Sequence, residues 1–272
     1  MPLQKQFDPH ESWRIFRIMA EFVEGFEVMA PIGKGVSVFG SARTKPDDPM
    51  YQAAEETARL LVKSKFAVIT GGGPGIMEAA NKGAFDAGGV SVGLNISLPQ
   101  EQEGNKYQNV SLDFHYFYAR KVMFTKYAEA FIYFPGGYGT LDELFEVLTL
   151  VQTLKVDAFP VVLFGSAYWS GLVEWMNKTL RPKFVDLEDI DIFKIVDDPK
   201  EAVRIIRKRW WKPLDPDLLI VERAASGKKA TGKLPVEGTS ATAGDTGEGT
   251  RYGKRPRRPG KNHVESKKKP QQ

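Results

Sequence analysis

The stretch FPGGYGTLDELFEVL, residues 134–148, sets a proline and three glycines between two segments of opposite character. Upstream, residues 130–134 (AFIYF) are short, apolar and rich in aromatic side chains, which predicts a buried strand. Downstream, Leu141, Leu144 and Leu148 recur at helical spacing, and acidic residues occupy the expected first turn. A glycine-rich turn between a strand and a helix exposes backbone N–H groups that stabilise an anion. We therefore expect a strand, an anion-binding turn and a helix.

The composition excludes several classes of protein. The chain has 272 residues, of which 42% are hydrophobic, so it can bury a substantial core. It has no cysteine, which excludes disulfides and thiolate metal sites, and its three histidines favour no metal centre. We find neither a run of 18 apolar residues nor a signal-peptide pattern at the start. We expect a cytoplasmic protein without a membrane span, a metal or a cofactor.

The charge is unevenly divided along the chain. Residues 224–272 contain 12 Lys and Arg against 4 Asp and Glu, whereas residues 1–223 contain 26 against 30. The basic stretch is rich in Gly, Lys, Ser, Thr and Pro and has almost no large apolar residues, so we predict a disordered tail. Residues 1–223 are predicted to be a single domain. Its mildly acidic balance argues against nucleic-acid binding, except weakly through the tail.

Predicted strands and helices alternate through residues 1–223. An opening helix, residues 10–29, carries Ile15, Ile18, Met19, Phe22 and Phe26 on one stripe. Further helices are predicted at 50–65, 74–88, 116–128, from about 141, 168–180 and 199–211, and strands at 35–42, 66–73, 89–96, 109–115, 130–134, 159–165 and 190–196. Repeated strand–helix units predict an α/β fold with a doubly wound, mostly parallel sheet and helices on both faces.

A second glycine cluster, TGGGPGIMEAAN at residues 70–81, also follows a predicted strand. It does not match the dinucleotide fingerprint, because Ile76 occupies the position of the third glycine, and it lacks the Gly-Lys-Ser/Thr of a P-loop. Ligands of parallel sheets bind beyond the carboxyl ends of the strands, where both clusters fall. Two such turns at one edge favour a phosphate-binding site over two structural turns.

The motifs GGGPGIMEAAN, ARK at residues 119–121 and PGGYGTLDE at residues 135–143 together resemble the Lonely guy family of cytokinin riboside 5′-monophosphate phosphoribohydrolases. These proteins are often labelled lysine decarboxylase-like. The chain matches every fixed position of the family signature PGGxGTxxE. The resemblance covers about residues 35–164 and is greater to the longer members. It implies a modified Rossmann fold, hydrolysis of the N-glycosidic bond of a nucleoside 5′-monophosphate, and a homodimer or higher homo-oligomer.

The resemblance also implies roles for individual residues. Arg120 and Glu143 would form the catalytic pair, and Lys121 would contact the substrate. An acidic contact would come from Glu101 or Glu103, between which spacing does not decide. The remaining substrate- and phosphate-binding positions would be Gly72, Gly73, Gly136, Gly137, Tyr138, Gly139, Thr140 and Thr149.

This chemistry suits the residue types. Loss of the base builds positive charge at the anomeric carbon, which a carboxylate such as Glu143 can stabilise while it orients or deprotonates water. Arg120 could hold that carboxylate or a ribose hydroxyl. The structural alternatives are a helix-dipole role for Glu143 and a solvated Arg120. We interpret His115 as a structural or substrate-edge residue, and Trp210 and Trp211 as helix-end packing.

Three other functions remain open at this stage. The same motifs would serve a broader nucleotide 5′-monophosphate nucleosidase that acts on AMP or other nucleotides. They would also serve a non-catalytic carrier of nucleotides or of the molybdenum cofactor, although Arg120 and Glu143 speak against it. Lysine decarboxylation is the weakest alternative, because no arrangement for pyridoxal phosphate is visible.

Overall fold

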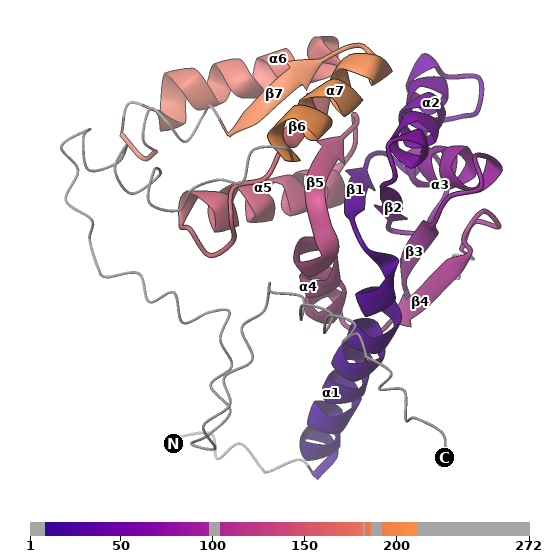
Figure 1. The fold of residues 1–272 in the computed structure, drawn as a ribbon. Coiled ribbons are helices and arrows are strands. Elements are labelled where there is room, and N and C mark those ends of the chain that lie inside the picture. The colour runs from indigo at the N-terminus through magenta and orange to yellow at the C-terminus, as the bar shows by residue number, and fades with distance from the viewer. Residues whose placement is uncertain (1–8, 98–103, 182, 186–191, 211–272) are drawn as a thin grey trace, which may run out of the picture. The chain divides into compact units, whose positions relative to one another are not determined.

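A computed structural model describes residues 9–97, 104–181, 183–185 and 192–210 (Figure 1). The chain divides into two units, Met1–Pro216 and Asp217–Gln272. The second unit lies outside the described residues, so the predicted boundary after residue 223 and the predicted disorder of the tail stay predictions. Within the described part, no helix combines the length and the hydrophobicity that a membrane span needs.

The centre of the fold is one seven-stranded sheet in the order β4-β3-β2-β1-β5-β6-β7. Every neighbouring pair of strands in it is parallel, which confirms the predicted α/β class. The strands are β1 (Gly35–Phe39), β2 (Ala67–Thr70), β3 (Ser91–Ile96), β4 (Val110–Phe114), β5 (Ala128–Tyr133), β6 (Val161–Phe164) and β7 (Phe193–Val196).

Helices connect the strands as the sequence predicts. They are α1 (Pro9–Met29), α2 (Pro49–Lys63), α3 (Ile76–Asp86), α4 (Phe117–Tyr127), α5 (Tyr138–Gln152), α6 (Ser166–Trp175) and α7 (Pro199–Trp210). A short 3₁₀ turn, Ala30–Ile32, follows α1, and a π-helical turn, Met176–Leu180, extends α6.

The sheet separates two hydrophobic cores, which makes the fold doubly wound. In β5, Phe131 and Tyr133 belong to the core under α4, α5 and α6. Ala130 and Ile132 face the opposite core, under α2, α3 and α7. Because successive side chains of a strand point to opposite faces, a strand buried on both faces must be apolar throughout. This requirement explains the continuous apolar run that precedes the glycines.

The strand order reverses between β1 and β5, and the two glycine turns meet there. Ser41, just beyond β1, donates its backbone N–H to the Pro135 carbonyl after β5, at 2.9 Å. Its own carbonyl accepts from the N–H of Ile76, the first residue of α3, at 3.0 Å. Ser41 therefore joins both turns at the topological switch point, where ligands of such sheets bind.

One local expectation needs correction. Helix α5 begins at Tyr138, three residues earlier than the apolar spacing indicates, so Asp142 and Glu143 lie beyond its first turn. The stripe on α1 is only partly covered within this chain: Ile18 and Phe22 are half-buried, whereas Ile15 and Met19 are exposed.

Candidate active site

The turn between β5 and α5 presents bare backbone to solvent. Gly137 and Gly139 are exposed, and a Cβ atom added at either would meet nothing within 4 Å. The two preceding backbone carbonyls accept hydrogen bonds within the protein. That of Pro135 accepts from the Ser41 N–H, and that of Gly136 accepts from the Tyr168 hydroxyl at 2.6 Å. The first N–H groups of a helix have no intrahelical partner, so this end of α5 can receive an anion.

The turn between β2 and α3 is buried and tightly held. Gly72 has a φ of +72°, and its carbonyl accepts hydrogen bonds from the Asn105 backbone N–H at 2.8 Å and from Gln108 Nε2 at 2.9 Å. Asn105 Nδ2 also lies 3.0 Å from the carbonyls of Gly72 and Gly73. A Cβ atom at Gly72 would lie 1.8 Å from Asn95 Oδ1. Glycine is therefore required here by both the backbone angle and the space.

Arg120 on α4 leans over this turn. A Cβ atom at Gly71 would lie 2.8 Å from Arg120 Nη2, so the missing side chain makes room for the guanidinium. The guanidinium carbon also lies 5.3 Å from the centre of the Phe124 ring. Burial lowers the pKa of Arg120 and the charge of Glu143 raises it, but arginine stays cationic at neutral pH. Its buried Nε has no hydrogen-bond partner among the described residues.

Glu143 lies in α5, one turn inside the open helix end. It is only 8% exposed, and burial raises its pKa to about 7, against the charges of Lys121 and Arg120, which lower it. The Tyr133 hydroxyl donates to the Glu143 backbone carbonyl at 3.1 Å, which fixes the helix to the sheet at this point. A carboxylate that titrates near neutrality can exchange a proton during catalysis.

Lys121 lies among three carboxylates of α5. Its Nζ is 2.8 Å from Asp142 Oδ2 and 3.7 Å from Glu143 Oε1, and it also pairs with Glu146 Oε2. Burial lowers the pKa of Lys121, but its hydrogen bonds to Asp142 and Glu146 outweigh that effect and raise it. The lysine thus ties α4 to α5 beside Glu143.

Of the other predicted site residues on α5, Tyr138 and Thr140 lie at the turn and Thr149 does not. Thr140 is buried beside Gly136, where an added Cβ atom would lie 2.1 Å from the threonine Oγ1, and Tyr138 is 91% exposed. The Thr149 hydroxyl donates to the Phe145 carbonyl at 2.7 Å, and Thr149 lies about 13 Å beyond Thr140 along the helix. The structure therefore does not bring Thr149 to the turn.

Several predicted positions lie away from the site or outside the described residues. His115 lies between β4 and α4, where its Nδ1 is 3.2 Å from Glu21 Oε1, and Glu21 also accepts from the His115 backbone N–H at 2.9 Å. This contact fits the structural interpretation. Glu101 and Glu103, the side chain of Trp210 and all of Trp211 lie outside what the structure describes.

Sequence reasoning missed the residues that hold the turns: Ser41, Asn105, Gln108 and Tyr168. Asn105 and Gln108 stand in a polar segment that reads as an ordinary loop. No periodicity or motif marks them, because their role depends on contacts between segments distant in sequence. No group of three His, Asp or Glu side chains in the described ranges is arranged to hold a metal ion.

Comparisons with known proteins bear on the family and on the fold. A family model described as "Possible lysine decarboxylase" matches residues 77–206. Cytokinin riboside 5′-monophosphate phosphoribohydrolase LOG5 of Arabidopsis thaliana is 28% identical over 75% of this chain and 89% of its own length. The enzyme LOG1 of the same plant is 32% identical over 63% of this chain and 81% of its own length.

Solved structures with the same fold include a structural genomics target, TM1055. It is 28% identical, with a TM-score of 0.50 over 64% of this chain and 99% of its own. The molybdenum cofactor carrier protein of Chlamydomonas reinhardtii has the same TM-score, 0.50, over 66% of this chain and 99% of its own; at 20% identity it supports the fold alone. With relatives above 30% identity matched over most of their length, this chain belongs to the cytokinin riboside 5′-monophosphate phosphoribohydrolase family.

Proposed function

We propose that the protein hydrolyses the N-glycosidic bond of a nucleoside 5′-monophosphate, either a cytokinin riboside 5′-monophosphate or AMP, to a free base and ribose 5-phosphate. One observation carries the proposal. Glu143, almost buried and with a pKa near 7, lies one turn inside a helix whose N-terminus is open to an anion. This geometry suits a substrate whose phosphate is held at the helix end while its sugar reaches the carboxylate.

The phosphate would bind at the N-terminus of α5. Gly137 and Gly139 have no side chain to obstruct an anion, and the helix dipole favours negative charge there. Binding of the phosphate is remote from the bond that breaks, so its energy can orient the ribose toward Glu143.

Glu143 would act on the anomeric carbon and on water. As the bond to the base weakens, positive charge develops on the sugar, and the ionised carboxylate stabilises it. Water then adds its oxygen to the anomeric carbon. The proton released by this water passes to the Glu143 carboxylate, the departing base takes a proton from solvent, and Glu143 then returns its proton to solvent, so the net reaction consumes one water. The ionised form is needed, so cleavage should fall as the pH drops below about 7.

Arg120 would supply the donor that faces this reaction. Its buried Nε lacks a partner among the described residues, and a buried donor left unpaired costs about 1–3 kcal/mol. The Arg120 side chain as a whole is only partly buried, so its terminal nitrogens can donate to a ribose hydroxyl or to the substrate phosphate. The guanidinium rests on Gly71 and Phe124, which holds its orientation before the substrate arrives.

The test measures release of base and ribose 5-phosphate from AMP and from N6-isopentenyl-AMP. The wild type should cleave at least one, and Glu143→Gln should lose about 100-fold or more. Glu146→Gln is the matched control, because Glu146 also pairs with Lys121 but is more exposed; it should keep most of the activity.

The pattern of results separates the alternatives. A strong preference for the isopentenylated nucleotide indicates the cytokinin activity, and comparable rates indicate a broader nucleosidase. Binding of both nucleotides without cleavage of either would reject hydrolysis and favour a carrier.

We also propose that the chain forms a homo-oligomer through α1 and α4. These helices pack closely, since a Cβ atom at Gly25 would lie 2.6 Å from Met123 Cε. Both expose large apolar side chains, and contiguous exposed patches mark interaction sites. The exposed residues are Trp13, Ile15, Phe16, Met19, Val23, Phe26, Phe117, Tyr118 and Val122. Light scattering should give a mass above that of one chain, and Phe16→Glu should lower it.

A further inference from the structure

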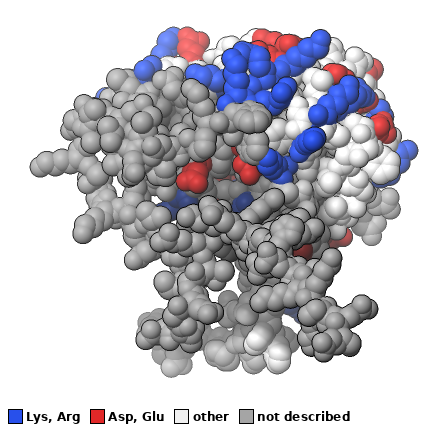
Figure 2. All heavy atoms as spheres, in the orientation of Figure 1, with Lys and Arg blue, Asp and Glu red and all other residues white. Residues whose placement is uncertain are grey.

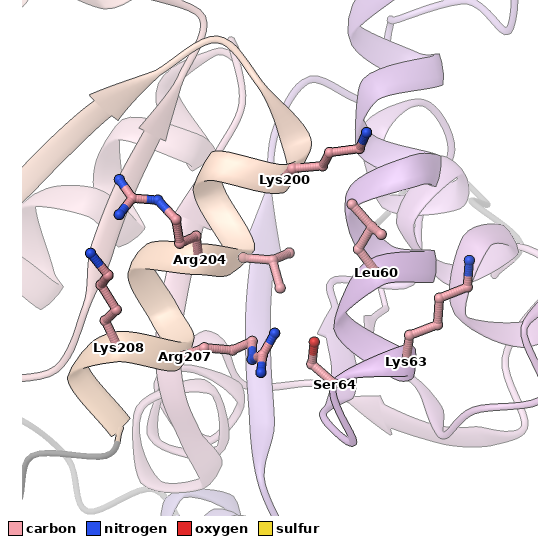
Figure 3. A pocket seen from close by; sticks show the side chains of 8 residues that line it. Leu60, Lys63, Ser64, Lys200, Arg204, Arg207 and Lys208 are labelled. Carbon is pink, nitrogen blue, oxygen red and sulfur yellow. The ribbon is translucent and has the colours of Figure 1, made fainter.

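A groove lined by basic side chains lies between α2 and α7 (Figure 3). Its volume is about 470 Å³. Lys63 and Ser64 line it from the end of α2, and Lys200 and Arg207 line it from α7. In Figure 3 the side chains of Lys200 and Arg207 point from α7 toward α2, with Arg207 facing Ser64.

The groove is separate from the candidate active site. Ser64 directly follows α2 and precedes β2, so it lies at the edge of the sheet where β2 starts. The glycine turns lie at the opposite edge, after β2 and β5 have ended. A ligand in the groove would therefore not occupy the proposed substrate site.

The positive charge of the groove is largely unneutralised. Within the described part of the chain, no ion pair involves Lys63, Lys200 or Arg207, whereas Arg204 on the same helix pairs with Glu201. Figure 2 shows basic side chains gathered over the region where Figure 1 places α2 and α7. Residues 1–223 are net acidic, so this clustering is not a consequence of overall composition. Clustered like charges repel one another, and bound anions relieve that repulsion.

The lining favours a particular class of ligand. Leu60 and Val203 provide an apolar surface between the cations, which suits the carbon skeleton of an organic molecule. The Ser64 hydroxyl can donate to a phosphate oxygen. Lys200 and Arg207 both point toward α2 and stand about 10 Å apart along α7, so one phosphate would leave part of the charge unpaired. The volume falls within the range of small-molecule sites, whereas nucleic acids use extended basic faces.

We propose that this groove binds a small organic anion carrying two or more phosphate groups, at a second site distinct from that of the substrate. The proposal does not depend on the hydrolytic activity, because binding is measured directly.

The experiment titrates the full-length protein with ATP and with inorganic tripolyphosphate by calorimetry, in the absence of magnesium. The groove variant is Lys200→Glu/Arg207→Glu. The control variant, Lys155→Glu/Lys194→Glu, changes the net charge equally at two exposed lysines outside the groove. This control also accounts for anions bound by the basic residues 224–272. AMP cleavage or AMP binding, measured in all three proteins, reports on the proposed substrate site.

We expect the groove variant to weaken ATP binding by about tenfold or more, and the control variant to leave it within about twofold. ATP should bind more tightly than tripolyphosphate, because Leu60 and Val203 contact its organic part. AMP cleavage or binding should be unchanged. Equal ATP affinity in the groove and control variants would overturn the proposal. So would a groove that binds a single-stranded oligonucleotide but neither ATP nor tripolyphosphate.

Discussion

The two glycine turns at the switch point are alike in composition and opposite in surroundings. In the turn after β2, Gly71, Gly72 and Gly73 are buried, and polar side chains hold the carbonyls of Gly72 and Gly73. In the turn after β5, Gly137 and Gly139 are exposed and adjoin open space. Glycine therefore serves two purposes at one sheet edge. The first turn needs it to fit the protein's own atoms, and the second leaves room for a ligand.

This difference also divides the proposed chemistry. The buried turn supplies the surface over which Arg120 lies, and the exposed turn supplies the helix end that leads to Glu143. One turn fixes a side chain before binding, and the other receives the anion. The same substitution made in each turn should therefore have different effects: in the buried turn it should lower stability, and in the exposed turn it should weaken ligand binding.

The largest difference in stability is expected between two variants that each add one methyl group, one in the buried turn and one in the exposed turn. Gly72→Ala should lower the free energy of unfolding by about 3 kcal/mol, because it combines a left-handed backbone angle with a Cβ atom 1.8 Å from Asn95 Oδ1. Gly137→Ala should change it by less than about 1 kcal/mol, since its φ of −93° suits alanine and the space is open. Urea unfolding measures both.

The activities of the same two variants sharpen the comparison. Gly137→Ala should raise the KM for a nucleotide more than it changes stability, because the new methyl group stands at the proposed phosphate position. Equal losses of stability in the two variants would contradict the division between a buried frame and an open site.

Removing a hydrogen bond to a carbonyl of the buried turn should also lower stability more than removing one at the exposed turn. Asn105→Ala removes the amide that reaches the carbonyls of Gly72 and Gly73 and also Asn81 Oδ1, at 2.9 Å. It should cost about 2 kcal/mol, because three acceptors each lose one hydrogen bond, although the Gly72 carbonyl keeps its bonds to the Asn105 backbone N–H and to Gln108. Tyr168→Phe, which removes the hydroxyl on the Gly136 carbonyl at the exposed turn, should cost less than about 1 kcal/mol. Thermal unfolding of both variants tests the order, and a larger loss for Tyr168→Phe would reverse it.

The sequence predicts the turns and helices that form the site better than it predicts the side-chain contacts between them. Both turns are predictable because each follows an apolar run, and parallel strands bring their carboxyl ends to one edge. Local spacing places Glu143 and Arg120 on helices, although it sets the start of α5 three residues too late. The contact of Arg120 with Gly71 is not predictable, because it joins a helix to a turn that lies 49 residues earlier in the sequence.

Lys121 and Asn105 show the same limit. The spacing of Asp142, Glu143 and Glu146 on one helix is visible in the sequence, but their meeting with Lys121 depends on how α4 packs beside α5. Asn105 stands in a polar loop, and only the tertiary structure brings its amide to Gly72. Side chains that position a turn from a distant loop carry no periodic signal, so sequence patterns do not reveal them.

The stability of the folded protein should depend on pH through Glu143, which follows the exposed turn. The pKa of Glu143 is raised in the folded state from 4.5 to about 7, so the folded protein holds this proton more tightly than the unfolded chain does. Its contribution to stability is therefore present below pH 4.5 and is lost as the pH rises to about 7. Glu143→Gln should be more stable than the wild type above pH 7, by up to about 3 kcal/mol, with little difference near pH 4. Urea unfolding across this range gives the values, and a difference that is constant with pH would contradict a buried, titrating carboxyl.

The smallest effect is expected from Lys121→Met, which keeps the length of the side chain but removes its charge. The charge of Lys121 lowers the pKa of Glu143, so its loss should raise that pKa further. Less of the carboxylate would then be ionised at neutral pH, and the acidic limb of the kcat/KM profile should move to higher pH. We expect a few-fold loss of cleavage at pH 6.5 that is largely recovered at pH 8.5. A loss independent of pH, carried by KM, would instead indicate that Lys121 contacts the substrate directly, as the family resemblance implies.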